Sequence, residues 1–495
     1  MTIREVGDSA ADAFFDRRTM LASTGASVLL LSDSAMAKRA KPPLAFDPTW
    51  MSAWQIRDAI VAKKTTALAV TDHFLGRIAN LDKTLHAFRD VKPEWAREQA
   101  RAADVALTAG QQPGPLFGVP VAIKEHIEVK GLIRIEVQGH GLQQDGIARV
   151  GQDDAISVER LRAAGAIIIG TTVMPGMGLG AGMKDFAHHP RNPWNTSTVP
   201  GSSSAGSAAA VASAMVPLAM GGDGGGSTRL PSALCGVIGI HPTTGRVPDV
   251  SYDKDYFRLL TGTFGPISRD VRDIAITLNA ISGPDGRDMM STLHAAAPDY
   301  LSQLGQSLQG TRVGWTEDFG FASTYFNAET PAIGAKVKEA ALRLGELGAV
   351  VTNSSIKAES FWPHVAVTMG FYDGEKQDSA AVRAALQARK RNRAIFDREL
   401  EKFDILVSPT AIFTAPTVEQ WDERWRKLSY VPHYTATTFM FNWIMLPAIN
   451  VPVGFLNGMP VGMQLVGKPD SEPKLLQVAE AFMTRFPRNE RPTIS

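Results

Sequence analysis

The sequence predicts an α/β protein that forms a single large domain, with a mixed central β-sheet covered by helices on both faces. Segments with helical periodicity alternate with short apolar strands along most of the chain. Hydrophobic residues make up 44% of the 495 positions, which is enough for a large core. No internal repeat or low-complexity linker divides the chain. Alternating helices and apolar strands favour a sheet buried between helical layers.

The first 37 residues have the pattern of a twin-arginine signal peptide. Arg17-Arg18 is followed by a mostly apolar or small run over residues 20–31 and then by an A-x-A cleavage pattern at 35–37. The apolar run is shorter than the roughly 20 residues that a membrane span requires. Several acidic residues before and beside the arginine pair leave an amphipathic or disordered tail as the alternative. We predict a signal peptide at 1–37, export to the periplasm or beyond, no stable membrane insertion, and a folded domain at 38–495.

Helix and strand patterns follow in order. Residues 52–64 and 68–82 carry apolar residues three to four positions apart, which is typical of amphipathic helices. A short apolar strand is predicted over 118–124. Residues 155–170 and 340–352 each predict a helix that ends at a glycine and is followed by a strand.

The C-terminal part predicts further buried strands at 403–409, 447–455 and 459–467, the last two joined by a tight turn. Two polar stretches interrupted by proline, 283–310 and 355–400, are expected to be surface insertions.

Charge and composition exclude several functions. Fifty-one basic and fifty acidic residues leave a net charge of +1, so there is no electrostatic basis for nucleic-acid binding. The single cysteine, Cys235, excludes an internal disulfide and is expected to be a buried core thiol. No two histidines lie three to five residues apart, so no metal site and no cofactor are predicted.

Two loops rich in small residues bracket one predicted helix and strand. "GSSSAG" at 201–206 precedes an alanine-rich helix, and "GGDGGGS" at 221–227 follows a buried strand. Ligands of open α/β sheets bind at the carboxyl ends of strands. Three glycines directly before Ser227 could offer unobstructed backbone N–H groups beside a nucleophilic hydroxyl, which is the composition of an oxyanion hole. From spacing alone, a tight glycine turn with a capping serine is the alternative.

Other nucleophile schemes fit less well. The chain contains no GxSxG motif, which excludes the nucleophile elbow of α/β-hydrolases. SxxK occurs at Ser251 and Ser354, but neither serine opens an apolar helix. Residues 462–468 imitate a phosphate loop, but Pro469 stands where serine or threonine would hold magnesium.

Longer motifs resemble the amidase signature family. They are "GPLFGVPVAIKEHIEVKG" at 114–131, the stretch from "RNPWNTST" to "GRVP" at 191–248, and the strands at 403–409 and 447–467. The resemblance extends over about residues 50–485. It implies the amidase signature fold and hydrolysis of a carboxylic amide C–N bond through a serine acyl-enzyme, with a small-molecule amide as partner. A homodimer is a candidate assembly.

The resemblance also assigns the catalytic residues. It implies a triad of Lys124, Ser203 in a cis peptide, and Ser227 as nucleophile, with oxyanion N–H groups from Gly224, Gly225, Gly226 and Ser227. A lysine with its ordinary pKa of about 10.4 is protonated at neutral pH. Burial at the end of an apolar strand beside a helix N-terminus would lower that pKa. A neutral Lys124 could then take the proton of Ser203 while Ser203 takes that of Ser227.

The sequence departs from the family around the expected pocket. His126 stands where many members have asparagine, and we expect it to touch substrate. Residues 171–183 lack a carboxylate that is usual there and carry Met174, Met177 and Met183, which predict either an adaptable apolar pocket or core packing. Ser202 and a segment of the C-terminal strand region complete the expected pocket. That segment contributes the aromatic residues Phe439, Phe441 and Trp443 together with Met440. Asp223 and Arg229 are expected to form a structural ion pair.

An apolar pocket predicts apolar or aryl amides as substrates, with side activity on carbamates or esters. The alternative is a component of an amidotransferase complex that uses glutamine as ammonia donor. A non-catalytic binding protein on the same scaffold is a third hypothesis, which the complete triad disfavours.

Overall fold

The computed structural model describes residues 46–138, 145–175, 189–250, 261–368, 379–425 and 431–494. The predicted signal peptide and two pocket candidates, Met177 and Met183, lie outside the described residues. Residues 46–495 cluster as one compact unit.

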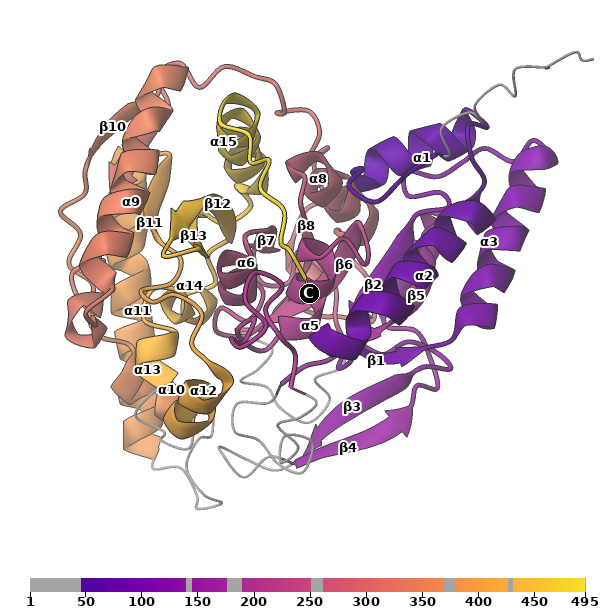
Figure 1. The fold of residues 1–495 in the computed structure, drawn as a ribbon. Coiled ribbons are helices and arrows are strands. Elements are labelled where there is room, and N and C mark those ends of the chain that lie inside the picture. The colour runs from indigo at the N-terminus through magenta and orange to yellow at the C-terminus, as the bar shows by residue number, and fades with distance from the viewer. Residues whose placement is uncertain are drawn as a thin grey trace, which may run out of the picture. The chain divides into compact units, whose positions relative to one another are not determined.

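The centre of this unit is a mixed sheet of eleven described strands (Figure 1). Their spatial order is β1 (Phe88–Val91), β5 (Ile167–Thr172), β2 (Pro120–Lys124), β6 (Leu218–Asp223), β8 (Thr263–Ser268), β7 (Ile238–His241), β12 (Ala448–Leu456), β13 (Met459–Val466), β11 (Ile405–Pro409), β9 (Arg312–Trp315) and β10 (Val350–Asn353). The strands β5, β2 and β6 are parallel, as are β11, β9 and β10, and the pairings between these groups are antiparallel. The predicted mixed α/β sheet is confirmed.

Helices cover the sheet. They are α1 (Ala53–Val61), α2 (Ala67–Leu85), α3 (Pro93–Thr108), α4 (Ile156–Ala163), α5 (Ala205–Ala212), α6 (Arg229–Cys235), α8 (Val271–Ile281), α9 (Thr330–Arg343), α10 (Trp362–Thr368), α11 (Ser379–Lys402), α12 (Val418–Trp425), α13 (Val431–Tyr434), α14 (Phe439–Trp443) and α15 (Glu472–Arg485). Successive side chains of a strand point to opposite faces, and every residue of β2 is buried, so both faces are covered there. The helices α2 and α5 both contact β2.

Glycines end helices where the sequence predicts. In the 155–170 segment, α4 is followed by Gly165 with φ +90° and then by β5. In the 340–352 segment, α9 continues into a short 3₁₀ turn, and Gly348 with φ +93° precedes β10. Only glycine adopts such angles without strain, so these positions are reliable stop signals. The β12–β13 turn likewise has positive φ at Asn457 and Gly458.

The prediction of a surface insertion at 355–400 is wrong. This stretch contains α10 and the 24-residue helix α11, whose apolar face is buried. The ring of Phe396 lies 5.7 Å from that of Phe319 and 5.4 Å from that of Phe441. The buried positions of this helix lie among many arginines and include two polar residues, Asn392 and Glu399, so the apolar stripe is weak in the sequence and only tertiary packing reveals it. Residues 283–310 consist of turns, bends and a short 3₁₀ helix, Ser291–Leu293.

The assignment of residues 439–443 to a strand region is also wrong. This aromatic segment is the short helix α14, and all five of its residues are buried. Aromatic residues have an intrinsic preference for strands, but tertiary packing can override that preference.

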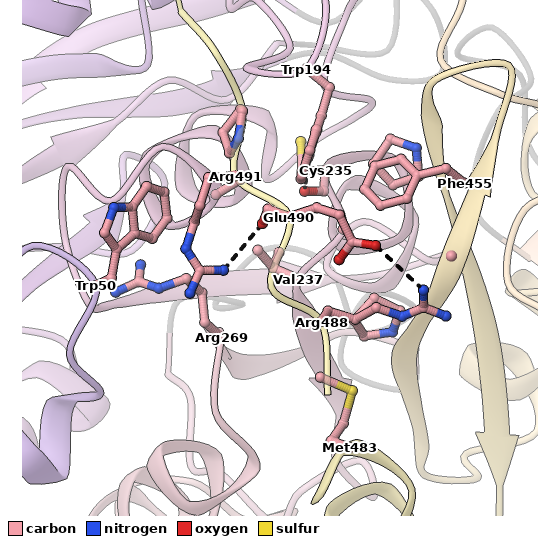
Figure 2. A pocket seen from close by; sticks show the side chains of 16 residues that line it. Trp50, Trp194, Cys235, Val237, Arg269, Phe455, Met483, Arg488, Glu490 and Arg491 are labelled. Atoms are coloured by element: carbon pink, nitrogen blue, oxygen red, sulfur yellow. Dashed lines mark hydrogen bonds and ion pairs between the residues drawn. The ribbon is translucent and has the colours of Figure 1, made fainter. Parts of the chain in front are cut away.

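A separate hairpin is formed by β3 (Ile133–Gln138) and β4 (Asp145–Val150). Cys235 ends α6 as a fully buried thiol, as predicted, and burial raises its pKa. It borders a cavity of about 70 Å³ whose walls include Trp50, Trp194 and Arg491 (Figure 2). Within the described ranges, no helix is both long and apolar enough to cross a membrane.

Phe396→Ala tests whether α11 belongs to the core. Because the ring is fully buried between two other aromatic rings, we expect its removal to lower the free energy of unfolding by about 3–5 kcal/mol. The control is Leu386→Ala on the same helix, whose side chain is 43% exposed and which should change stability by less than about 0.5 kcal/mol. Urea titration of both variants measures the difference. Similar small effects would mean that α11 is a detachable insertion.

Candidate active site

The parallel pairing of β2 and β6 brings two predicted site segments to one edge of the sheet. Val121 pairs with Leu218 and Ile123 with Met220, so both strands end at nearly the same level. Lys124 is the last residue of β2, and the glycine loop follows the end of β6. The Nζ atom of Lys124 donates a hydrogen bond of 2.9 Å to the carbonyl of Gly222. The sheet therefore holds the predicted base against the glycine segment.

Ser203 lies in the loop that precedes α5. Lys124 Nζ donates to Ser203 Oγ over 2.8 Å. The peptide bond between Ser202 and Ser203 is cis, as the family resemblance implies. Two of the three predicted triad side chains are thus in direct contact.

Ser227 lies on the loop beside Ser203. The backbone N–H of Ser204 donates to the carbonyl of Ser227 over 3.0 Å, which joins the two loops. Ser203 and Ser227 are both partly exposed, whereas Lys124 is 1% exposed, so the site opens on the serine side. Within the described residues, the Ser227 hydroxyl has no hydrogen-bond partner, so the contact between the two serine hydroxyls is not formed in this structure.

The environment of Lys124 lowers the pKa of its amino group. Burial disfavours the ammonium form and lowers the pKa of Lys124 to about 7, although the carboxylates of Asp223 and Glu125 oppose the shift. A large fraction of this lysine is therefore neutral near pH 7 and can accept the proton of a hydroxyl.

Glu125 anchors the end of β2. Its carboxylate binds Arg89 over 2.5 Å and accepts the backbone N–H of Met174, also over 2.5 Å. Burial raises the pKa of Glu125, and the Arg89 charge opposes that shift. This carboxylate, to which the sequence assigns no role, ties Lys124 to the segment after β5.

His126 borders the site. A Cβ atom added to Gly222 would lie 2.5 Å from atoms of the His126 imidazole, so the ring packs directly on the residue whose carbonyl binds Lys124. His126 is partly exposed, and its ring also contacts Phe264 edge-on. Its expected contact with substrate is compatible with this position.

The remaining pocket candidates differ in how far they are exposed to solvent. Met174 is half-buried beside Glu125, but Ser202 is 1% exposed and its hydroxyl donates to the carbonyl of Pro175 over 2.9 Å. Tyr434 binds both the N–H and the carbonyl of Ser202, over 2.6 and 2.9 Å. Ser202 therefore holds its loop in place and does not line an opening. Phe439 is 2% exposed and belongs to the core with its neighbours in α14.

One of the four predicted oxyanion donors is already engaged. The N–H of Gly226 donates to Asp223 Oδ1 over 2.6 Å, so it cannot also bind a substrate oxygen. This corrects the expectation for Gly226. Among the described residues, no acceptor takes the N–H groups of Gly224, Gly225 or Ser227. These three amides are the available donors.

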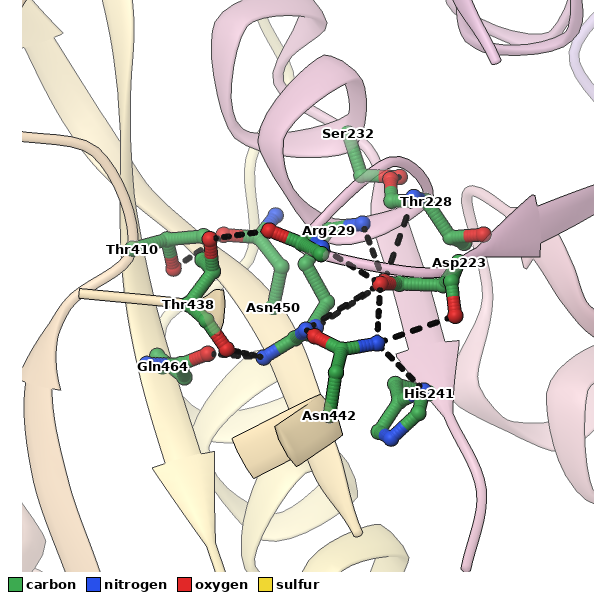
Figure 3. Close-up of polar contacts among 12 residues, drawn as sticks. Asp223, Thr228, Arg229, Ser232, His241, Thr410, Thr438, Asn442, Asn450 and Gln464 are labelled. Atoms are coloured by element: carbon green, nitrogen blue, oxygen red, sulfur yellow. Dashed lines mark hydrogen bonds and ion pairs between the residues drawn. The ribbon is translucent and has the colours of Figure 1, made fainter. Parts of the chain in front are cut away.

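The glycine loop is supported by a buried polar network (Figure 3). Asp223 and Arg229 form the predicted ion pair at 2.9 Å with no exposure of either side chain. Gln464 and Asn442 accept hydrogen bonds from the same guanidinium over 2.7 and 2.5 Å, and Asn442 also donates to Asp223. Burial would raise the pKa of Asp223, but the Arg229 charge and the hydrogen bonds from Arg229 and Asn442 together outweigh burial and hold that pKa well below its usual range.

Sequence reasoning missed Asn442 and Gln464. Each lies more than 200 residues from its partners in the loop, and a lone amide carries no local pattern that points to such a contact.

In the described part of the chain, no group of three or more His, Cys, Asp or Glu side chains could hold a metal ion. The site as described contains a lysine of lowered pKa, two serines and three available backbone donors.

Known proteins are similar to this chain in sequence and in fold. The profile of the Amidase family matches residues 69–381 and 368–476. A glutamyl-tRNA(Gln) amidotransferase subunit of Moorella thermoacetica is 32% identical over 491 residues, covering 88% of this chain and 96% of that protein. A solved structure described as a vestigial protein complex that reveals the origins of an s-triazine catabolic enzyme has a TM-score of 0.75 and 26% identity, covering 90% of this chain and all of the other. A bacterial aryl acylamidase shares the fold, with a TM-score of 0.73 at 22% identity, covering 89% and 98%.

The pKa of Lys124 predicts a pH dependence for the reactivity of Ser227. Because the base must be neutral, the rate of Ser227 phosphonylation by a fluorophosphonate should rise with pH as one group titrates with a midpoint near 7. The Glu125 carboxylate favours the charged lysine, so Glu125→Gln should move this midpoint to lower pH. Mass spectrometry of the labelled peptide gives the rate at each pH. A rate that does not change between about pH 5.5 and about pH 9 would contradict a role for Lys124 as base.

Proposed function

This chain belongs to the amidase signature family, and on that basis we propose that it cleaves a carboxylic amide C–N bond through a covalent acyl-enzyme on Ser227. One observation carries the proposal: the buried Lys124, whose pKa is near 7, contacts Ser203. The loop that holds Ser203 is hydrogen-bonded directly to the loop that holds Ser227.

The first half of the reaction forms the acyl-enzyme. Neutral Lys124 takes the proton of Ser203 while Ser203 takes that of Ser227, and Ser227 Oγ forms a bond to the carbonyl carbon. The carbonyl π electrons move to the oxygen, and the N–H groups of Gly224, Gly225 and Ser227 stabilise the oxyanion. When the oxyanion collapses, the C–N bond breaks, and the nitrogen leaves with the proton returned from Lys124 through Ser203.

The second half releases the acid. Water attacks the ester carbonyl, and its proton passes to Lys124 through Ser203. The second tetrahedral oxyanion uses the same three amides, and its collapse breaks the bond to Ser227 Oγ. Ser227 regains its proton along the same path, so the enzyme ends the cycle in its starting state.

Two substrate classes are candidates: glutamine and apolar or aryl amides. The comparisons support glutamine better than the aryl amides. The curated relative of 32% identity is named as a component of a glutamyl-tRNA(Gln) amidotransferase, which favours a glutamine amide. The aryl acylamidase is only 22% identical and supports the fold alone. The apolar-pocket hypothesis also loses support because Phe439 and the rest of α14 pack into the core. We therefore place glutamine first.

The apolar or aryl amide stays the second candidate, with carbamates and esters as side substrates. It is favoured by the half-buried Met174 next to the site. The predicted leader at residues 1–37 also favours it, because an exported enzyme would work apart from the tRNA that an amidotransferase serves.

Ser227→Ala tests the nucleophile. Because Ser227 Oγ makes no hydrogen bond to the described residues, its removal should leave the melting temperature within about 2 °C of the wild type. Amide hydrolysis should fall by several orders of magnitude, since no acyl-enzyme can form. Product release and differential scanning calorimetry measure the two effects. Wild-type turnover in the alanine variant would overturn the assignment of Ser227.

A substrate panel tests the order of the two classes. Purified protein is assayed for ammonia release from glutamine and for amine release from an anilide, with Ser227→Ala as the blank. We expect kcat/KM for glutamine to exceed that for the anilide at least tenfold. If the anilide is the better substrate, the glutamine proposal is wrong and the apolar-amide hypothesis is right.

A further inference from the structure

The peptide group between Gly225 and Gly226 is held at both of its polar ends. Its N–H, from Gly226, donates to Asp223 Oδ1 over 2.6 Å. Its carbonyl, from Gly225, accepts from the hydroxyl of Thr438 over 2.9 Å. A peptide group is planar, so fixing the two ends fixes the orientation of the whole plane.

This peptide lies between two of the available oxyanion donors. The N–H of Gly225 belongs to the peptide before it, and the N–H of Ser227 belongs to the peptide after it. The direction in which both amides point therefore depends on the central plane. Glycine has a wide range of accessible backbone angles, so this segment needs restraint from outside to keep one orientation.

Thr438 supplies that restraint from the far side of the chain. It is the residue before α14, it is fully buried, and its own carbonyl accepts from Arg229 over 3.2 Å (Figure 3). A Cβ atom added to Gly226, where φ is +116°, would lie 2.2 Å from Thr438 Oγ1, so the threonine packs directly on this peptide. The ring of Phe439 packs on Gly225 in the same way, 2.7 Å from an added Cβ.

The direction of the Gly225 carbonyl matters for charge. Thr438 keeps this carbonyl turned into the buried interior, whereas Ser227 faces the opening of the site. If the plane turned over, the negative end of a peptide dipole would face the oxygen on which negative charge develops, and the neighbouring amides would turn away. The hydrogen bond from the Thr438 hydroxyl to the Gly225 carbonyl opposes such a turn.

From this geometry we propose that Thr438 is a positioning residue of the oxyanion hole, acting through the Gly225–Gly226 peptide. The proposal rests on the proposed function, because it concerns the stabilisation of the same tetrahedral oxyanion. It predicts that Thr438 contributes to the transition state and little to binding of the ground state.

The test compares two substitutions that differ in the hydroxyl. Thr438→Val removes the donor at nearly constant volume, and we expect kcat to fall about 10- to 100-fold with KM within threefold of wild type, somewhat less than the loss of a direct oxyanion donor. Thr438→Ser keeps the hydroxyl and should stay within about threefold of wild type. Inhibition by a trifluoromethyl ketone, which forms a tetrahedral adduct, should weaken by the same factor as kcat/KM.

Thr437→Val is the matched control. Thr437 is the neighbouring buried threonine, and its hydroxyl donates to the carbonyl of Thr410 over 2.8 Å without touching the glycine loop. This variant loses a comparable hydrogen bond and should be destabilised to a similar extent, but its kcat should stay within twofold of wild type. If Thr438→Val does not fold, Thr438→Cys replaces it, since a thiol is a weak donor, and an intermediate loss of kcat is expected.

The oxyanion effect is distinguishable from an effect on the base. Thr438→Val should lose rate equally on an amide and on its activated ester, because both pass through an oxyanion. It should also leave the midpoint of the pH profile unchanged. Unchanged kcat in folded Thr438→Val, a loss confined to KM, or failure of serine to restore activity would overturn the proposal. Absence of both hydrolysis and Ser227 labelling in the wild type would instead overturn the proposed function.

Discussion

The buried ion pair between Asp223 and Arg229 is the interaction on which the geometry of the site depends. Both side chains are fully removed from solvent, so each charge requires partners in every direction. The carboxylate accepts backbone N–H groups from the loop itself, and the guanidinium reaches Asn442, Gln464 and the segment before α14. Loss of one member of such a pair typically costs about 3–5 kcal/mol, because the other charge stays buried alone. Hydrogen bonds to this charged pair therefore tie down the loop despite its glycines.

The same ion pair determines which of the proposed oxyanion amides are unoccupied in the structure. Asp223 accepts a hydrogen bond from the N–H of Gly226, so this amide is not one of the unoccupied donors. Asp223 also exerts the largest opposing charge effect on Lys124, where it favours the ammonium form against the effect of burial. A single carboxylate thus shapes the set of proposed oxyanion donors and moderates the pKa of Lys124. The pKa near 7 is a balance between burial and the surrounding negative charge.

The two sides of the site come from distant parts of the chain. Lys124 ends β2, Ser203 lies in the segment before α5, and the glycine loop follows β6, which is the parallel neighbour of β2. Their support comes from α13, α14 and β13, where Tyr434 holds the Ser202 loop and Asn442 and Gln464 hold Arg229. The proposed catalytic residues therefore lie in compact motifs, whereas the residues that hold them in place are dispersed along the chain.

The α/β class, the helix–glycine–strand units and the positions of Lys124, Ser203 and Ser227 can be predicted from the sequence, because each of these is encoded within a short segment. Periodicity, positive-φ glycines and a long contiguous motif all act locally. Tertiary structure alone decided that α11 belongs to the core, that the aromatic segment at 439–443 is a helix, and that Gly226 is engaged by Asp223. These outcomes depend on packing and on hydrogen bonds between residues that are far apart in the chain or on the turn geometry of a glycine loop. Neither leaves a periodic or compositional pattern in the sequence.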